Sequence, residues 1–307
     1  MSQTVIQVQS LIKKFGHDTV LDDVTFSTGQ GELFGFIGPD GAGKTTLFRI
    51  MATLMLADSG SVSVFGFDVV RDFKQIRSLI GYMPGRFSLY QDLSVEENLH
   101  FFAAVFGTTV NENYHLIHDI YSQIEPFRKR LAGQLSGGMK QKLALSCALI
   151  HAPQCLILDE PTTGVDAVSR VEFWNMLKNL QKQGITILVS TPYMDEAGLC
   201  DRIALFQQGR ILSIDTPDRV AGSYNKKLWA VHADEKYTLI ESLKSRSEID
   251  SVNTFGDSVH ITTTDNRLDK SALILFLKER LSGEITVSQI APTIEDCFLR
   301  LMRKQPV

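Results

Sequence analysis

The sequence predicts an α/β domain followed by a smaller α+β domain, and three observations carry this expectation. Short apolar runs that predict strands alternate with helical patterns up to about residue 220, which is the order of an α/β domain. Two of the runs, Cys155–Leu158 and Ile185–Ser190, are largely apolar, and such runs suit central parallel strands that are covered on both faces. After a polar stretch, Ala221–Lys227, the order of the elements changes.

The first part of the chain contains a glycine-rich loop between a strand and a helix. The predicted strands there are Val5–Leu11, Val20–Phe26, Leu33–Ile37 and Ser61–Val64, separated by Gly and Asp turns. The loop follows Leu33–Ile37, and a helical pattern runs from about Lys44 to Met55. Residues 94–150 are predicted to be mainly helical, and Ile203–Phe206 predicts one more strand.

The second part predicts a β-α-β-β-α-β order, the ferredoxin-like arrangement. Its predicted elements are strand Leu228–Ala233, helix Tyr237–Ser245, strands Val252–Phe255 and Ser258–Thr263, helix Lys270–Leu281 and strand Ile285–Ile290. A last helix is expected to begin at Thr293, because Thr293 and Asp296 have the spacing of a capping box. The predicted domains are therefore residues 1–222 and 223–307.

Composition excludes several classes of protein. The 307 residues include 31 Lys and Arg against 35 Asp and Glu, with 44% hydrophobic and 21% charged residues, which excludes collagen-like, coiled-coil and disordered chains. The slight acidity argues against a nucleic-acid partner. The four cysteines form no CxxC pair, so we expect reduced thiols in a cytoplasmic protein. The sequence shows neither an apolar run long enough to span a membrane nor the order of a signal peptide.

The glycine-rich loop has the residues needed to bind phosphate groups. It fits the pattern G-x-x-x-x-G-K-[ST] and comprises Gly38, Pro39, Asp40, Gly41, Ala42, Gly43, Lys44 and Thr45. Glycines let backbone N–H groups face the phosphates at the N-terminus of a helix. Lys44 is then expected to reach the β- and γ-phosphates, and the Thr45 hydroxyl to bind Mg²⁺.

A pair of acidic residues ends one of the apolar strands. Asp159 and Glu160 directly follow Cys155–Leu158. We expect the Asp159 carboxylate to hold Mg²⁺ and Glu160 to polarise the attacking water. Together with the phosphate loop in this order, the pair predicts a nucleoside triphosphatase.

A third motif precedes this strand and indicates the family. Leu135–Gln141 (LSGGMKQ) would by itself predict a helix start with Ser136 as N-cap. In this position it resembles the LSGGQ signature of ATP-binding cassette (ABC) proteins. Pro161–Asp166 resembles the D-loop of that family, and Ser190–Ala197 occupies its switch segment. Phe15 stands where the family places the aromatic residue that stacks on adenine. The resemblance covers residues 5–220.

The resemblance implies a P-loop ATPase domain with a helical subdomain at about 86–150, ATP and Mg²⁺ as cofactors, and a dimer that encloses ATP. The implied nucleotide contacts are Phe15, Gly38, Pro39, Asp40, Gly41, Ala42, Gly43, Lys44, Thr45, Thr46 and, towards the other subunit, Ser136, Gly137 and Gly138. The implied magnesium ligands are Thr45 and Asp159, and the implied catalytic residues are Lys44 and Glu160.

The end of the chain extends the resemblance to a narrower group. Ala291–Leu299 (APTIEDCFL) resembles the ending of ATPase subunits of bacterial multidrug and polysaccharide-type ABC exporters. Those subunits work with a separately encoded membrane permease, so the resemblance implies a position on the inner face of the cell membrane through that permease. Residues 223–307 are then expected to form a regulatory or dimer-stabilising domain. Near residues 87–90, an apolar docking patch for the permease and an ordinary core remain alternatives.

Two positions depart from the family pattern. Gly85 stands where the family has Gln, and Pro192 stands where it has His. Proline offers no N–H and no titratable group, and glycine offers only backbone. Loss of one preorganised donor commonly lowers a rate by about 10²–10³, although losses within one unit do not simply multiply. We therefore expect ATP binding with slow or absent hydrolysis, unless Tyr193, Gln91 or a partner residue substitutes.

We expect the chain to be an ATPase subunit of an exporter. The alternatives are a clamp that closes on ATP without hydrolysing it and the degenerate member of a heterodimer. A homodimer would have both sites impaired. A further rival is an ABC protein of translation or DNA repair, but such proteins usually carry two cassettes or a long coiled-coil insertion, which this sequence lacks.

Overall fold

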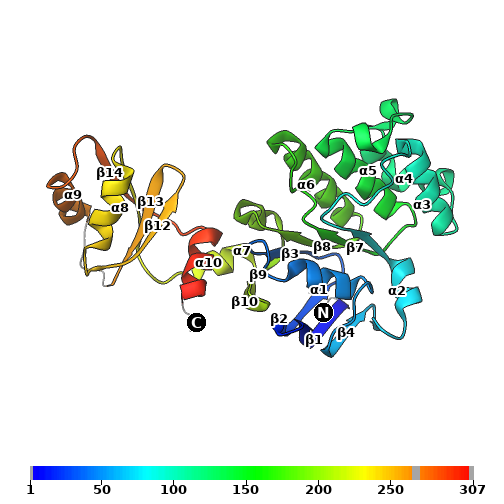
Figure 1. Ribbon diagram of the computed structural model, residues 1–307, viewed down its shortest axis with the longest axis horizontal. Helices are drawn as coiled ribbons and strands as arrows, with labels where there is room; N and C mark the ends of the chain where they lie inside the picture. The colour runs from blue at the N-terminus through cyan, green and yellow to red at the C-terminus, as the bar shows by residue number, and fades with distance from the viewer. Residues whose placement is uncertain (1–2, 265–269, 304–307) are drawn as a thin grey trace. The chain divides into compact units, whose positions relative to one another are not determined.

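The computed structural model describes residues 3–264 and 270–303 (Figure 1). The chain divides into two compact units, one up to Pro217 and one from Asp218 to Arg303. The sequence places this boundary after residue 222. In the structure, α7 (Pro217–Gly222) belongs mostly to the second unit, where the Cys297 Sγ lies 3.4 Å from the carbonyl oxygen of Val220.

The first unit is built on a six-stranded sheet with the order β10-β9-β3-β8-β7-β6. Its strands are β3 (Leu33–Ile37), β6 (Ile80–Met83), β7 (Cys155–Asp159), β8 (Thr186–Thr191), β9 (Arg202–Gln207) and β10 (Arg210–Asp215). All neighbours pair in parallel except β9 and β10. Every residue of β3, β7 and β8 is buried, which confirms that the apolar runs are central strands.

A second, antiparallel sheet with the order β2-β1-β4-β5 completes the core of this unit (Figure 1). Its strands are β1 (Thr4–Phe15), β2 (Asp18–Gly29), β4 (Ser59–Val64) and β5 (Phe67–Asp68). The core contains aromatic residues from both sheets and from α1 (Lys44–Met51). Phe36 lies at the centre, with ring centroids 4.9 Å from Phe26, 5.1 Å from Phe34 and 5.4 Å from Phe48. This packing fixes α1 beside the end of β3.

Helices dominate residues 94–150, as predicted. The elements are α3 (Val95–Val105), α4 (Val110–Tyr121), two short 3₁₀ turns, η1 (Glu125–Phe127) and η2 (Ala132–Gln134), and α5 (Gly137–Leu149). Capping boxes at Ser94 and Thr109 begin α3 and α4. Two further helices, α2 (Phe73–Leu79) and α6 (Ala167–Lys182), flank this region in the sequence, with the 3₁₀ helix η3 (Met194–Leu199) after β8.

The second unit has the predicted ferredoxin-like topology. Its elements are β11 (Leu228–Ala233), α8 (Lys236–Lys244), β12 (Ile249–Phe255), β13 (Ser258–Thr263), α9 (Lys270–Lys278), β14 (Ile285–Ile290) and α10 (Ile294–Arg303). The antiparallel sheet has the order β12-β13-β11-β14, and residues of α8 and α9 complete its core. The predicted capping box also forms, because the Asp296 N–H donates to Thr293 Oγ1 at 3.2 Å and the Thr293 N–H to Asp296 Oδ2 at 2.9 Å.

Several elements differ from the sequence expectations. The first helix ends at Met51 rather than at Met55, and Thr53 has a φ of 60° that no helix continues through. Strands β6 and β10 and helix α2 were not predicted from the sequence. All four cysteines are free and buried. In the described part of the chain, no helix combines the length and apolar character that crossing a membrane requires.

Candidate functional site

The phosphate-binding loop lies between the end of β3 and the start of α1, where glycines are required for different reasons. Gly43 has a φ of 106°, and a Cβ there would lie 2.6 Å from the carbonyl oxygen of Val20. A Cβ on Gly38 would lie 2.0 Å from the carbonyl oxygen of Phe206. The loop is therefore held against two neighbouring segments that exclude any side chain at these positions. A pocket lies beside it, lined by Val20, Gly41, Ala42, Gly43, Lys44, Thr45, Thr46 and Glu160.

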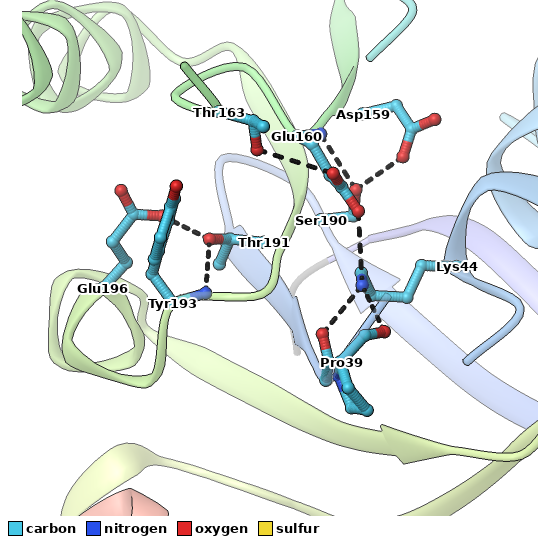
Figure 2. A network of polar contacts seen from close by, with 10 residues as sticks. Pro39, Lys44, Asp159, Glu160, Thr163, Ser190, Thr191, Tyr193 and Glu196 are labelled. Atoms are coloured by element: carbon cyan, nitrogen blue, oxygen red, sulfur yellow. Dashed lines mark hydrogen bonds and ion pairs between the residues drawn. The ribbon is translucent and has the colours of Figure 1, made fainter. Parts of the chain in front are cut away.

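Lys44 is only 3% exposed, and three oxygen atoms surround its ammonium group. Its Nζ donates to the carbonyls of Gly38 at 2.7 Å and Pro39 at 2.9 Å, and lies 3.3 Å from Glu160 Oε1 (Figure 2). A buried cation is stable only when such acceptors are present. The ammonium is thus already in the loop, in a position where anionic phosphate oxygens would be better acceptors than neutral carbonyls.

Asp159 ends β7 and is 1% exposed. Its Oδ1 accepts a hydrogen bond of 2.6 Å from the hydroxyl of Ser190, on the neighbouring strand β8 (Figure 2). Burial, followed by the charge of Asp159, raises the pKa of Tyr82 to about 12. Carboxylate and hydroxyl oxygens are the ligands that Mg²⁺ prefers, so Asp159 and Thr45 have the chemistry to hold this ion.

Glu160 occupies a strained backbone position directly after Asp159. Its φ is 49°, in the left-handed region that non-glycine residues rarely adopt. Its N–H donates to the Ser190 carbonyl at 3.1 Å and hydroxyl at 3.0 Å, and its Oε2 accepts from Thr163 Oγ1 at 3.4 Å. Such strain persists where the surroundings determine it, and here it turns the carboxylate towards Lys44.

Gly85 lies beside Asp159. A Cβ at this position would lie 3.1 Å from the Asp159 carbonyl oxygen and 3.7 Å from Asp159 Oδ2. A side chain on residue 85 would therefore begin beside the carboxylate that is expected to hold magnesium. Glycine leaves that space without a polar group.

At Pro192, the chain passes the phosphate loop without offering a donor. The preceding Thr191 carbonyl accepts from the Gly38 N–H at 3.2 Å, so the two segments are adjacent. The ring of Tyr193, one of the two residues named as the alternative that could substitute, lies under the guanidinium of Arg170, which is 4.9 Å from the ring centroid. Figure 2 shows that ring beside Glu196, on the far side of Thr191 from Lys44.

Gln91, the other such residue, lies with the 3₁₀ turn η2. Its carbonyl oxygen accepts from the Gly133 N–H at 3.0 Å. A Cβ on Gly133 would approach the Gln91 side chain at 3.4 Å. In this conformation the Tyr193 ring packs on Arg170 and Gln91 lies beside Gly133. That either residue substitutes at positions 85 and 192 stays a prediction.

The Ser136–Gly138 segment begins α5 and lies against the Gly164–Ser169 segment. Ser136 is the N-cap, as predicted, and its Oγ accepts from the Met139 N–H at 3.4 Å. A Cβ on Gly138 would lie 2.6 Å from Ser169 Oγ. Ser136 and Gly137 are exposed at a helix N-terminus, a place that favours anions.

Phe15 ends β1 with its ring 49% exposed. The ammonium of Lys13 lies 5.4 Å from the ring centroid and 3.0 Å from Asp58 Oδ1. The ring is therefore held in place by a charged neighbour and still presents enough surface to stack on a flat base.

The site also contains Ser190, Thr162, Thr191 and Glu196, which were not identified as site residues from the sequence. Ser190 bonds both Asp159 and Glu160, and Glu196 bonds both threonines. The sequence signal for Ser190, Thr191 and Glu196 was their place in the Ser190–Ala197 segment, and Thr162 lies in Pro161–Asp166, which resembles the D-loop. Nothing in the sequence indicated that Glu196 is 2% exposed.

Comparison with known proteins agrees with this geometry. A family model described as ABC transporter matches residues 21–163. The chain is 41% identical over 219 residues to the probable multidrug ABC transporter ATP-binding protein YbhF of Escherichia coli, covering 70% of this chain but only 38% of that protein. The chain is also 32% identical over 312 residues to the Nod factor export ATP-binding protein I of a Rhizobium species, covering 99% of each.

Solved structures show the same fold. The structure of an ATP-binding subunit of an ABC transporter superposes with a TM-score of 0.65 at 27% identity, covering 72% of this chain and 93% of the other. The ATP-binding cassette MJ0796, in a dimeric post-hydrolysis state bound to ADP and Pi, superposes with a TM-score of 0.63 at 24% identity over 69% of this chain and 98% of that one. With its phosphate loop, acidic strand end and LSGG segment, the chain belongs to the ATPase subunits of the ABC transporter family.

Proposed function

We propose that this chain binds ATP with Mg²⁺ at the loop formed by residues 38–46. The observation that carries this proposal is the position of Lys44, whose ammonium lies among the Gly38 and Pro39 carbonyls and the Glu160 carboxylate. Phosphate oxygens take over from the carbonyls, while N–H groups of the loop and of the first turn of α1 donate to the remaining oxygens. The exposed ring of Phe15 stacks on adenine.

Thr45 and Asp159 hold Mg²⁺ in this proposal. The ion, when bound, neutralises charge that develops on the phosphates. Glu160 accepts the proton of the attacking water, because its carboxylate lies at the pocket next to Lys44. Its hydrogen bond from Thr163 and the two from its own N–H to Ser190 orient it for this role.

We further propose that the chain works as one of two ATP-binding subunits that drive export through a separately encoded membrane permease. The names of both relatives support this, since one is a probable multidrug transporter protein and the other a Nod factor export protein. The exposed Ser136 and Gly137, at the start of α5, face the nucleotide of the second subunit. These relatives favour a transport role over one in translation or DNA repair.

A groove in the first unit provides the docking surface for the permease. It has a volume of about 320 Å³ and is lined mainly by apolar side chains, including Leu54, Met83, Leu89, Phe102, Val105 and Phe106. Its lining residues come mainly from β6 and the segment that follows it, from α3 and α5, and from the residues that follow α1. Large apolar side chains of this groove, such as Val105 at 61%, are exposed, and exposed apolar surface of this kind marks interaction sites.

The site is proposed to be catalytically weakened, because positions 85 and 192 offer no side-chain donor. A single missing donor of this kind lowers a rate by about 10²–10³. Binding is retained, since Lys44, Thr45 and Asp159 are present. The alternative is a clamp that closes on ATP without hydrolysing it, or a degenerate subunit whose Ser136–Gly138 segment completes a competent site on its partner.

Single-turnover hydrolysis of Mg-ATP by an excess of purified chain tests the proposal. We expect tight binding with slow hydrolysis, loss of binding in Lys44→Ala, and a gain of rate in the Gly85→Gln/Pro192→His double variant. Rapid turnover that Glu160→Gln abolishes would show that the site is not weakened. Binding that Lys44→Ala leaves intact would place the nucleotide elsewhere.

A further inference from the structure

Glu196 is a buried carboxylate that the proposed chemistry does not use. It lies in η3 and is 2% exposed. One carboxylate oxygen accepts from Thr162 Oγ1 at 2.8 Å, and the other accepts from Thr191 Oγ1 at 2.5 Å (Figure 2 shows the second). A carboxylate only accepts hydrogen bonds, so both hydroxyls must direct their protons towards it.

The two threonines belong to different functional segments. Thr162 lies in the turn that follows Glu160, and its neighbour Thr163 donates to the Glu160 carboxylate at 3.4 Å. Thr191 ends β8 immediately before Pro192, and its carbonyl accepts from the N–H of Gly38. The carboxylate of Glu196 thus joins the turn that carries the catalytic base to the strand end beside the phosphate loop.

Further contacts hold the same network in place. Thr191 Oγ1 also accepts from the Tyr193 N–H at 3.1 Å. Arg170, from α6, lies with its Nε 3.9 Å from Glu196 Oε1 and its Nη2 3.6 Å from Asp195. A buried carboxylate requires hydrogen-bond donors and a nearby positive charge, and this one has both. Its two threonine partners belong to two segments of the site, the turn after Glu160 and the end of β8.

We propose that Glu196 is a positioning residue that couples the Glu160 turn to the Pro192 segment, so that the two move as one body. The proposal rests on the proposed function only in that this site is the one that binds ATP. Glu196 acts on Glu160 through Thr162 and the adjoining Thr163, and on Pro192 through Thr191.

The coupling can be measured in the full chain without nucleotide. NMR-detected hydrogen exchange of the Tyr193 amide reports on the Thr191 hydroxyl, to which this amide donates. Thr162→Val is expected to speed this exchange about tenfold, which is within the range of couplings measured between residues of one network. In a Glu196→Ala background, the same substitution is expected to have no further effect.

Thr186→Val is the matched control. Thr186 is a buried threonine at the other end of β8, and its hydroxyl accepts from the Gly31 N–H, not from the Glu196 network. It should leave the Tyr193 amide unchanged. The proposal is overturned if Thr162→Val does not alter exchange at Tyr193, or if its effect persists without the Glu196 carboxylate.

A second measurement separates positioning from general loosening. Glu196→Ala is expected to lower the single-turnover rate at least tenfold while the Kd for ATP changes less than about threefold. Glu196→Gln keeps the shape but only one acceptor oxygen, so its rate should lie between those of Glu196→Ala and the native chain. Equal losses of rate and affinity would overturn the proposal. If the native chain binds no ATP, the proposed function fails, whereas the exchange experiment still decides the coupling.

Discussion

The ammonium of Lys44 lies 3.3 Å from the carboxylate of Glu160, while the same nitrogen donates to two carbonyls of its own loop. The cation that is proposed to bind phosphate is therefore paired with the proposed catalytic base. Both groups are enclosed, with side-chain exposures of 2% and 21%. Binding of a triphosphate requires Lys44 to exchange this partner for phosphate oxygens, so ATP and the Glu160 carboxylate compete for one charge.

This competition predicts opposite effects of Glu160→Gln on affinity and on hydrolysis. Removing the carboxylate charge is expected to strengthen ATP binding about threefold, because it removes both a competitor for Lys44 and a negative charge beside the phosphates. Single-turnover hydrolysis should fall at least 10²-fold with the loss of the base. Isothermal titration and quench-flow measure the two quantities. Weaker binding by Glu160→Gln would contradict the competition.

The space at Gly85 predicts that a restored glutamine increases hydrolysis. A Cβ there meets the Asp159 carbonyl oxygen at 3.1 Å, which the neighbouring chain must relieve by a few tenths of an ångström. Gly85→Gln adds this crowding and a polar group near Asp159, whereas Gly85→Ala adds the crowding alone. We expect about a tenfold gain in single-turnover rate for the glutamine variant. The alanine variant should show no gain, and an equal gain in both would exclude the polar group as the cause.

The exposed ring of Phe15 predicts that stacking on the adenine base contributes to the affinity for ATP. Stacking between an aromatic side chain and a base contributes about 1–3 kcal/mol, so Phe15→Ala should raise the Kd for ATP about tenfold. Phe15→Tyr should bind like the native chain, because the ring remains. Inorganic triphosphate, which has no base, should bind Phe15→Ala and the native chain equally. A loss of triphosphate binding would mean that the substitution disturbs the loop itself.

Much of the fold could be predicted from the sequence because its strands are either wholly apolar or bounded by turn residues. Leu33–Ile37 and Leu228–Ala233 match their predicted limits. Strand β6 escaped prediction because it is only four residues long and contains Gly81, although a Cβ there would lie 2.3 Å from the Ala148 carbonyl oxygen. That close packing of β6 on α5 is tertiary and leaves no local pattern.

The candidate site likewise contains residues that the sequence identifies and residues that only the fold brings together. The loop and the pair Asp159–Glu160 have motifs of fixed spacing, so the order of residues alone is enough to identify them. Glu196 lies in the Ser190–Ala197 segment, but that resemblance does not reveal its partners, because Thr162 and Thr191 lie 34 and 5 residues away in the chain. Single acidic and hydroxyl residues are common on surfaces, and only the fold brings these three into one buried network.

The environment of the His151 imidazole predicts how the free energy of unfolding depends on pH. Its ring stacks on Phe106 at 3.8 Å, its Nε2 bonds the Ile80 carbonyl at 2.9 Å, and burial lowers the pKa of the imidazole below the usual 6.5. The unfolded chain therefore takes up a proton at this group before the folded chain does. Its contribution to stability is complete above about pH 6.5 and is lost as the pH falls from there to the lowered pKa of the folded state.

Replacing His151 with phenylalanine removes the titration while keeping a ring against Phe106. We expect the difference in the free energy of unfolding between the native chain and His151→Phe to be constant above about pH 6.5. Below that pH, the free energy of unfolding of the native chain should fall relative to that of His151→Phe. Urea unfolding between pH 5 and pH 8 measures this difference. His151→Ala loses the stacked ring and should be less stable than His151→Phe at every pH. A parallel pH dependence in the native chain and His151→Phe would show that the imidazole is not the group that titrates.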